Sequence, residues 1–307
     1  FVGNATITGG ITNGVVDVAR LLTSDISGGV VFAGTLVATT VSGGNGWVSN
    51  SATVGLLSAG SLSVGGVGAF TTVSGGTLNL NGATGSVMTL NGGSIFVGGS
   101  TVLTVSGGNS AGMINGGGSV VKDSGATLTL SGVNTFSGAL TVNGGSLVAA
   151  AGALGYTSGI TVNGATLSTV DYNSAAALIV NGSGFARISG NGLSLGAVSN
   201  ANTTMDSVLF SDVNGTISLA GLNGLGSTRF AGNATVNGGI SKGVVNVARL
   251  LTSDISGGVV NAGTLVATIV SGGNGTVASA ATVGQFNAGL LTVGGLGAFT
   301  TVSGGTL

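Results

Sequence analysis

The sequence contains no proline, no cysteine and no histidine, and only 4% of its 307 residues are charged. The missing cysteine excludes disulfides and thiolate metal sites, and the missing histidine excludes the usual nucleophilic triads and His-based zinc sites. Six basic residues against seven acidic ones, all of them aspartate, give a net charge of −1. No basic patch can therefore neutralise phosphates, so we predict no nucleic-acid partner.

Apolar residues and glycine make up most of the chain. Hydrophobic residues make up 43% of the chain, glycine occurs 64 times, and the mean hydropathy is +0.66. Disordered chains combine low hydrophobicity with high charge, and this chain has neither property. The best apolar run, Leu147–Gly155, is short and interrupted by glycine, whereas a spanning helix needs about 20 apolar residues. We predict no membrane-spanning segment.

A long internal repeat organises the chain. Phe1–Leu78 returns as Phe230–Leu307, at an offset of about 229 residues and with roughly three positions in four identical. We divide the chain into a first copy (1–78), intervening coils (79–229) and a second copy (230–307). A repeated segment indicates a chain whose task is to be long. We expect the sequence to be a piece of a longer protein, with ends that stack on further coils or another subunit.

Shorter signals within the repeat indicate strands and turns. Gly-Gly pairs recur about every 10–22 residues, and Asn-Gly and Ser-Gly pairs are predicted to supply the positive φ of tight turns. Between them, β-branched and apolar residues alternate with Thr, Ser or Asn, which is the period of a half-buried strand. These runs are Ala5–Ile7, Val15–Val18, Thr39–Val41, Thr71–Val73, Thr77–Leu80, Leu103–Val105, Thr127–Leu130, Thr141–Val142 and Thr161–Val162.

Short strands with glycine turns fit an antiparallel sandwich or barrel, or a parallel β-solenoid. Three features favour the solenoid: unbroken spacing, no proline to interrupt the ladder, and few charges to repel between stacked coils. We predict an all-β fold, a single continuous right-handed parallel β-helix over 1–307. At about 18 residues per coil it makes roughly 17 coils, a rod of roughly 80 Å. Val16–Thr23 and Asn173–Val180 have some helical spacing but are interpreted as strand plus turn.

The two copies are predicted to superpose with the same strand register. Their shared core residues should then meet the same packing demands. We place four residues of each copy in this core: Val15, Val18, Leu21 and Leu22, and their counterparts Val244, Val247, Leu250 and Leu251.

Residues 127–167 carry a family resemblance. The positions concerned are Leu130, Gly132, Asn134, Thr135, Phe136, Gly138, Thr141, Val142, Gly145 and Leu147, followed by Ala153-Leu154-Gly155 and a second strand at Thr161–Leu167. This segment resembles the autotransporter-associated β-strand repeat, or passenger-associated transport repeat, of bacterial surface proteins. The resemblance implies a right-handed parallel β-helix that is exported to the cell surface.

Candidate chemical groups are few. The acidic residues are Asp17, Asp25, Asp123, Asp171, Asp206, Asp212 and Asp254. Asp206 and Asp212 are the closest pair outside the copies, but no Lys or Arg accompanies them, with Arg229 distant in sequence. A β-helix glycosidase or lyase would need such grouping. We therefore predict no catalytic, cofactor-binding or metal-binding residues, and no cofactor.

Other residues have both a functional and a structural interpretation. Calcium-binding runs place Asp after Gly-Gly-x-Gly, but this chain has Val48 and Val277 at that position. A bound calcium ion would therefore be held mostly by Asp25 or Asp254 together with carbonyl oxygens of the turns. The charges Arg20 and Asp25, repeated in the second copy, are interpreted as a local Arg–Asp pair rather than a docking site.

Trp47 and Phe32 become Thr276 and Asn261 in the second copy. Positions that accept both an aromatic and a small polar residue are predicted to lie on the surface. An aromatic platform for sugar is a second interpretation, with a single Trp in support.

The first function hypothesis is a secreted or cell-surface bacterial structural protein, part of a fibre, stalk or sheath, whose partners are further copies of the repeat. The alternatives are an adhesin, which could contact cell-surface or matrix polysaccharide, and a β-helix carbohydrate-active enzyme. Ice binding through Thr39-Thr40 and Thr71-Thr72 is a further hypothesis, but the uneven coil spacing disfavours a regular array.

Overall fold

The computed structural model describes residues 3–82, 84–154, 156–190, 192–212 and 216–307. Every regular element in this part of the chain is a β-strand, so it contains no helix that could cross a membrane. The chain forms two compact units, Phe1–Ser158 and Gly159–Leu307. Each unit is a parallel β-solenoid, and the predicted all-β parallel fold is confirmed. That the solenoid is a single continuous rod over 1–307 stays a prediction.

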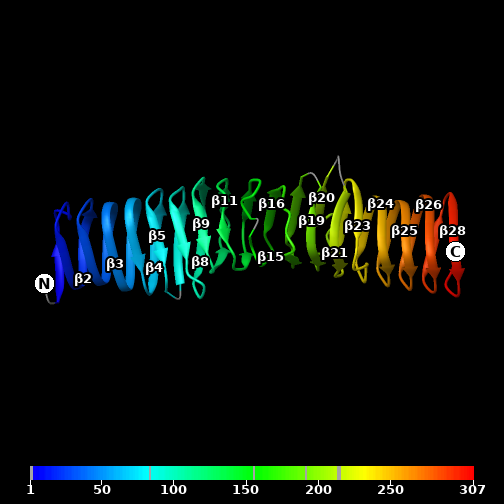
Figure 1. The fold of residues 1–307 in the computed structure, drawn as a ribbon, viewed down its shortest axis with the longest axis horizontal. Helices are drawn as coiled ribbons and strands as arrows, with labels where there is room; N and C mark the ends of the chain where they lie inside the picture. The colour runs from blue at the N-terminus through cyan, green and yellow to red at the C-terminus, as the bar shows by residue number, and fades with distance from the viewer. Residues whose placement is uncertain (1–2, 83, 155, 191, 213–215) are drawn as a thin grey trace. The chain divides into compact units, whose positions relative to one another are not determined.

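The described residues of unit 1 form fourteen strands, and Figure 1 shows them in chain order from blue to green. They pair in parallel with strands of neighbouring turns, as β1 does with β2 and β11 with β14. The strands are β1 (Asn4–Ile7), β2 (Val15–Ile26), β3 (Val30–Val64), β4 (Val67–Val73), β5 (Thr77–Leu80), β6 (Thr84–Leu90), β7 (Ser94–Val97), β8 (Val102–Ser110), β9 (Met113–Gly116), β10 (Ser119–Lys122), β11 (Thr127–Leu130), β12 (Thr135–Phe136), β13 (Leu140–Val142) and β14 (Ser146–Ala149).

Unit 2 repeats the same parallel arrangement, with β15 on β17 and β24 on β25, for example. Its strands are β15 (Gly159–Asn163), β16 (Thr166–Val170), β17 (Ala177–Asn181), β18 (Phe185–Ser189), β19 (Ser194–Asn200), β20 (Val208–Ser211), β21 (Thr216–Asn223), β22 (Ser227–Phe230), β23 (Asn233–Val236), β24 (Val244–Ile255), β25 (Val259–Val270), β26 (Asn274–Phe286), β27 (Leu290–Val293) and β28 (Leu296–Val302).

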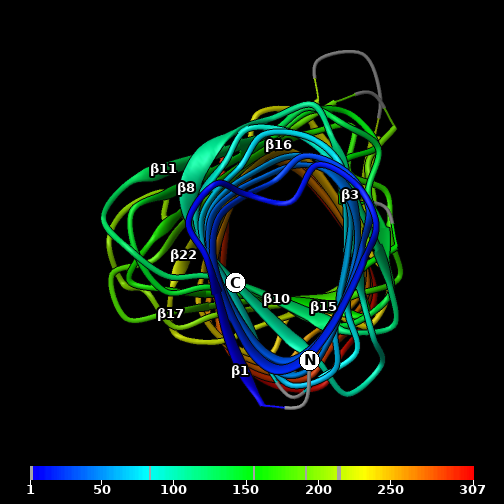
Figure 2. The ribbon, with the colours of Figure 1, turned by 90° about the vertical axis from the view of Figure 1, so that its left-hand side faces the viewer.

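The length of a turn varies within each unit. In the first copy Val15 pairs with Val30, a step of 15 residues, and these tight turns overlie one another in the blue part of Figure 2. In the intervening coils Leu195 pairs with Leu219, a step of 24. In the second copy Val244 pairs with Val259, again a step of 15. The predicted value of about 18 is therefore an average over turns of different size.

Alternation along each strand separates the interior from the surface. In β5 the residues Leu78 and Leu80 are buried while Thr77 and Asn79 are half-buried. Every alternating run predicted above lies inside a strand, and neither segment with helical spacing contains helix. Val16–Thr23 lies wholly within β2, so the predicted turn there was wrong, whereas Asn173–Val180 runs from a connection into β17. The core is a stack of Val, Leu and Ile side chains from successive turns, and their removal from water drives the fold.

The glycines of the corners have two different roles. Gly44 has φ of +66°, a left-handed conformation that favours glycine. Gly43 beside it is outside that region, but a Cβ there would collide with the carbonyl oxygen of Ser27 in the preceding turn. Five such pairs illustrate the turn prediction: Asn13-Gly14, Ser42-Gly43, Asn81-Gly82, Asn143-Gly144 and Asn163-Gly164. Of these five, the pairs that end in Gly14 and Gly164 have positive φ. The prediction was wrong for Gly43, Gly82 and Gly144, where the close approach of the neighbouring turn requires glycine.

The two copies keep the same register. Asn4 pairs with Arg20 and Val15 with Val30 in the first, and Asn233 with Arg249 and Val244 with Val259 in the second. Among the differing positions that the structure describes, those buried in either copy exchange one apolar residue for another: Ile7 for Val236, and Leu57 for Phe286. The remaining differences lie on half-buried or exposed positions, so the copies share an interior and differ outside.

Four of the eight residues predicted to form the shared core are buried: Val18, Leu21, Val247 and Leu250. The prediction was wrong for the rest. Val15 is 71% exposed and its counterpart Val244 is half-buried, while Leu22 and Leu251 are 40% and 41% exposed. The physical reason for the leucines is the local alternation in β2 and β24: Leu22 points outward between buried Leu21 and Thr23, and Leu251 does so between buried Leu250 and Thr252.

Candidate functional site

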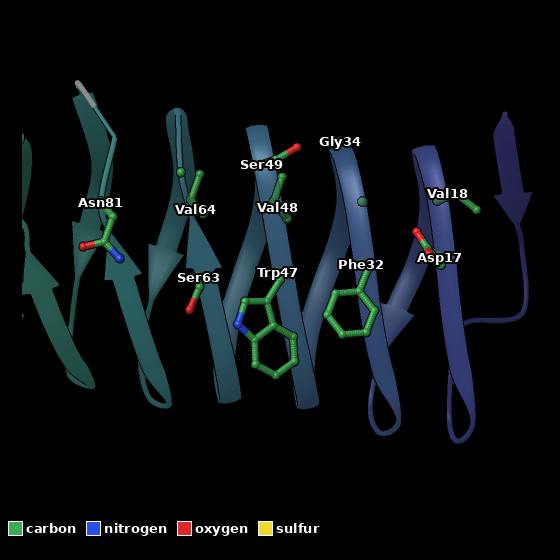
Figure 3. A pocket seen from close by; sticks show the side chains of 12 residues that line it. Asp17, Val18, Phe32, Gly34, Trp47, Val48, Ser49, Ser63, Val64 and Asn81 are labelled. Carbon is green, nitrogen blue, oxygen red and sulfur yellow. The ribbon is translucent and has the colours of Figure 1, made fainter. Parts of the chain in front are cut away.

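A row of outward side chains runs across successive turns of unit 1, from the first copy into the intervening coils. It consists of Asp17, Phe32, Trp47, Ser63, Asn79 and Phe96, one from each of six successive turns, and we call it the copy-1 ladder. Strand register places Asp17 beside Phe32, Ser63 beside Asn79, and Asn79 beside Phe96. Figure 3 shows Asp17, Phe32, Trp47 and Ser63 in this order on neighbouring turns.

The aromatic pair is the most distinctive part of this ladder. The ring centroids of Phe32 and Trp47 lie 5.2 Å apart with an interplanar angle of 19°. Phe32 is 42% and Trp47 47% exposed, which confirms that both positions are on the surface. Two stacked rings that together keep this much area in contact with water form an apolar platform, because packing against the turn covers only part of each ring.

The platform lies in a hollow of about 480 Å³. The backbone and side chains of Val18, Gly34, Val48 and Val64 also border it, with Asp17 at one end and Ser63 and Asn81 toward the other (Figure 3). Its lining contains one carboxylate, two hydroxyls and one side-chain amide but no lysine or arginine. The hollow therefore combines an apolar floor with hydrogen-bonding groups at its rim, the composition of a ligand-binding groove.

The second copy has different residues at the corresponding ladder positions. Asn246, Asn261, Thr276 and Thr292 follow one another in register, and Arg229 of the intervening coils precedes them on the same ladder. Asn261 donates from its amide nitrogen to the amide oxygen of Asn246 at 2.9 Å. Amide stacking of this kind satisfies both side chains along the ladder. The same backbone thus carries an aromatic platform in one copy and an amide pair in the other.

Asp206 has basic partners that the sequence distance concealed. Its carboxylate forms an ion pair with Arg229 at 3.2 Å, and Arg187 donates to its main-chain oxygen at 2.7 Å. The statement that no Lys or Arg accompanies Asp206 was wrong, because one turn of the solenoid brings residues about twenty positions apart into contact. Leu209 separates the two arginines on the ladder of β18, β20 and β22.

Asp212 performs a structural task away from Asp206. It is fully buried, and its Oδ2 accepts hydrogen bonds from the backbone nitrogens of Gly192 and Leu193 at 2.5 and 3.3 Å. A buried carboxylate that accepts backbone N–H groups is stabilised in its place and fixes the adjoining turn. Asp206 and Asp212 are close in sequence, but their carboxylates have different partners: an arginine side chain for Asp206 and backbone N–H groups for Asp212.

Asp25 binds a serine rather than an arginine. Ser42 donates to both carboxylate oxygens at 3.0 Å, and Ser271 does the same to Asp254 at 3.0 and 3.1 Å. Among the described residues Arg20 and Asp25 form no ion pair, so the predicted Arg–Asp pair was wrong. The described residues also include no group of three or more acidic side chains close enough to hold a metal ion.

Lys122 is a buried cation that the sequence analysis missed. It occupies the interior ladder position between Val105 and Val142 and is fully buried. Its Nζ donates to the carbonyl oxygens of Ser124 at 2.8 Å and Gly144 at 3.0 Å. Burial lowers the pKa of the Lys122 ammonium from its usual 10.5, while Asp123 acts in the opposite direction. The alternation Ser119-Val120-Val121-Lys122 places it on the inward face and could have revealed it.

Comparison with known proteins finds one family. The family model of the passenger-associated-transport-repeat matches residues 120–149, which overlap the segment where the resemblance was predicted, and the resemblance is confirmed. The match covers β10 to β14, including Lys122. No curated protein and no solved structure matches the chain. The repeat is a structural one associated with autotransporter passenger domains, and the fold around it is a β-solenoid of the passenger type.

Proposed function

We propose that the chain is a structural segment of a secreted or surface-displayed bacterial protein, in which stacked turns act as a fibre, stalk or sheath component. The observation that carries this proposal is the pairing of the two copies: they keep register and interior while their differences lie mostly outside. Such a pattern suits a scaffold that is extended by repetition. The transport-repeat match at 120–149 supports export.

Two measurements test this function. Small-angle scattering of the purified chain should give a radius of gyration well above the ~19 Å expected for a compact globular domain of this length. Antibodies raised against the chain should label intact cells of the source bacterium as strongly as lysed ones. Labelling that requires lysis contradicts display at the surface, and a radius near the globular value contradicts the extended scaffold.

An adhesin is the second candidate function, and the groove of the copy-1 ladder favours it. A chain that serves only as a spacer needs no exposed aromatic pair, since the second copy folds with Asn261 and Thr276 at the same positions. Exposed aromatic side chains cost solubility and are enriched where a protein contacts a partner. The groove would provide attachment on an otherwise uniform scaffold.

A further inference from the structure

We propose that the groove of the copy-1 ladder binds an uncharged polysaccharide, with a pyranose ring stacked on Phe32 and Trp47. This inference names a ligand for the adhesin candidate and rests on that proposed function. It does not depend on the structural role of the chain in a fibre, stalk or sheath. The bound group is identified by chemistry alone: a sugar ring with one face of C–H bonds and a rim of hydroxyl groups.

The groove offers a matching surface for each part of such a ring. The stacked rings at 5.2 Å present a continuous apolar floor to a C–H face. The Asp17 carboxylate can accept hydrogen bonds from sugar hydroxyls, and Ser63 and Asn81 at the opposite side can donate or accept them. An apolar floor flanked by a few oriented polar groups gives both affinity and orientation.

Charge selects against other ligands. The only ionisable group in the lining is Asp17, and no lysine or arginine borders the hollow. A phosphate, a sulfate or a uronate would meet a carboxylate without a compensating cation, which is unfavourable. Neutral sugars carry no such penalty, because their hydroxyls can donate to the carboxylate.

The ladder continues beyond the pair, which favours a polymer over a single sugar. Phe96 lies three turns past Trp47 on the same ladder and is 37% exposed. At about 4.8 Å per turn this adds a third aromatic contact about 14 Å away. A chain of linked sugars running along the ladder can use both contacts, and linked weak contacts raise the overall affinity.

The second copy supplies the matched control. Asp17, Phe32 and Trp47 are replaced there by Asn246, Asn261 and Thr276 in the same register. The double variant Phe32→Asn, Trp47→Thr therefore installs residues that this backbone already accommodates. The converse variant, Asn246→Asp with Asn261→Phe and Thr276→Trp, transfers the carboxylate and the aromatic pair to the second copy.

The experiment is affinity electrophoresis in gels that contain hydroxyethylcellulose, mannan or dextran, with polygalacturonate as the acidic probe. We expect at least one neutral polysaccharide to retard the wild-type chain and polygalacturonate to leave its mobility unchanged. The double variant should bind at least about tenfold more weakly, with an unchanged circular-dichroism spectrum. Met88→Thr, which removes a 61% exposed apolar side chain outside the groove, should bind as the wild type does.

Trp47 is the only tryptophan in the chain, so its fluorescence reports on the groove directly. Titration with the polysaccharide that retards the chain should change the emission, and the converse variant expressed in the double-variant background should regain retardation. Equal retardation of wild type and double variant would overturn the proposal, and so would the absence of retardation by all three neutral polymers. A fluorescence change with choline that Asp17→Asn abolishes, without a response to the polymers, would assign the groove to a quaternary ammonium instead.

Discussion

At the scale of single residues, buried Lys122 makes the stability of the chain depend on pH. Its ammonium is held by the carbonyls of Ser124 and Gly144 inside a stack of valines. Because burial lowers its pKa below 10.5 in the folded chain, the unfolded chain binds the proton more tightly. The free energy of unfolding should therefore rise as the pH increases toward 10.5.

Two substitutions of Lys122 distinguish the effect of its charge on the free energy of unfolding from the effect of its side-chain volume. Lys122→Met keeps most of the packing and should change the free energy of unfolding by less than about 1.5 kcal/mol. Lys122→Ala leaves a cavity and should cost about 2–5 kcal/mol. Urea unfolding between pH 7 and 10 checks both values. If the methionine variant shows the same rise with pH as the wild type, Lys122 is not its source.

At the scale of strands and turns, the corner glycines determine how closely one turn can follow another. Gly43→Ala would place a methyl group against the Ser27 carbonyl of the preceding turn and should cost at least about 2 kcal/mol. Gly9→Ala meets nothing within 4 Å and has no positive φ, so its effect should stay within about 1 kcal/mol. Thermal unfolding of both variants compares them. Equal effects would contradict steric control by the neighbouring turn.

The strands were predictable from sequence, but the size of the turns was not. Period-two alternation located every predicted run because burial of one face is a local signal. The step of 24 residues at Leu195 contains buried polar side chains: Asn200 donates to Ser207 and to the Ser227 carbonyl, and Asn202 donates to the Gly184 carbonyl. Ser227 and Gly184 lie on other turns, so neither these contacts nor the approach of Arg229 to Asp206 can be predicted from spacing.

The groove was predictable only in part for the same reason. Exchange of Trp47 for Thr276 and of Phe32 for Asn261 correctly indicated surface positions. The sequence counts a single tryptophan and gives no sign that a phenylalanine 15 positions earlier stacks on it. Only the step of the turn brings the two rings within 5.2 Å.

At the scale of the whole molecule, the exposed edge of β28 predicts self-association of this chain. Leu296 is 83% and Val302 52% exposed in that strand, and an apolar strand with unpaired backbone groups is a template for another strand. The apparent mass in sedimentation should increase with concentration. Leu296→Lys should reduce the association, since an edge lysine opposes pairing. Equal behaviour of the two chains would exclude this edge as the contact.

The positions of the basic residues also determine where trypsin can cleave the folded protein. Trypsin requires an extended, unpaired segment around Lys or Arg, yet Arg20, Arg187, Arg229 and Arg249 lie within strands and Lys122 is buried. Lys242, in the turn between β23 and β24, is the exposed basic residue outside the strands. We expect native digestion to begin after Lys242, because cleavage elsewhere needs local unfolding. Mass spectrometry of early fragments tests this, and a first cut within a strand would contradict it. Although the chain has no disulfides, it would then resist trypsin because most of its few Lys and Arg residues lie in strands or in the core.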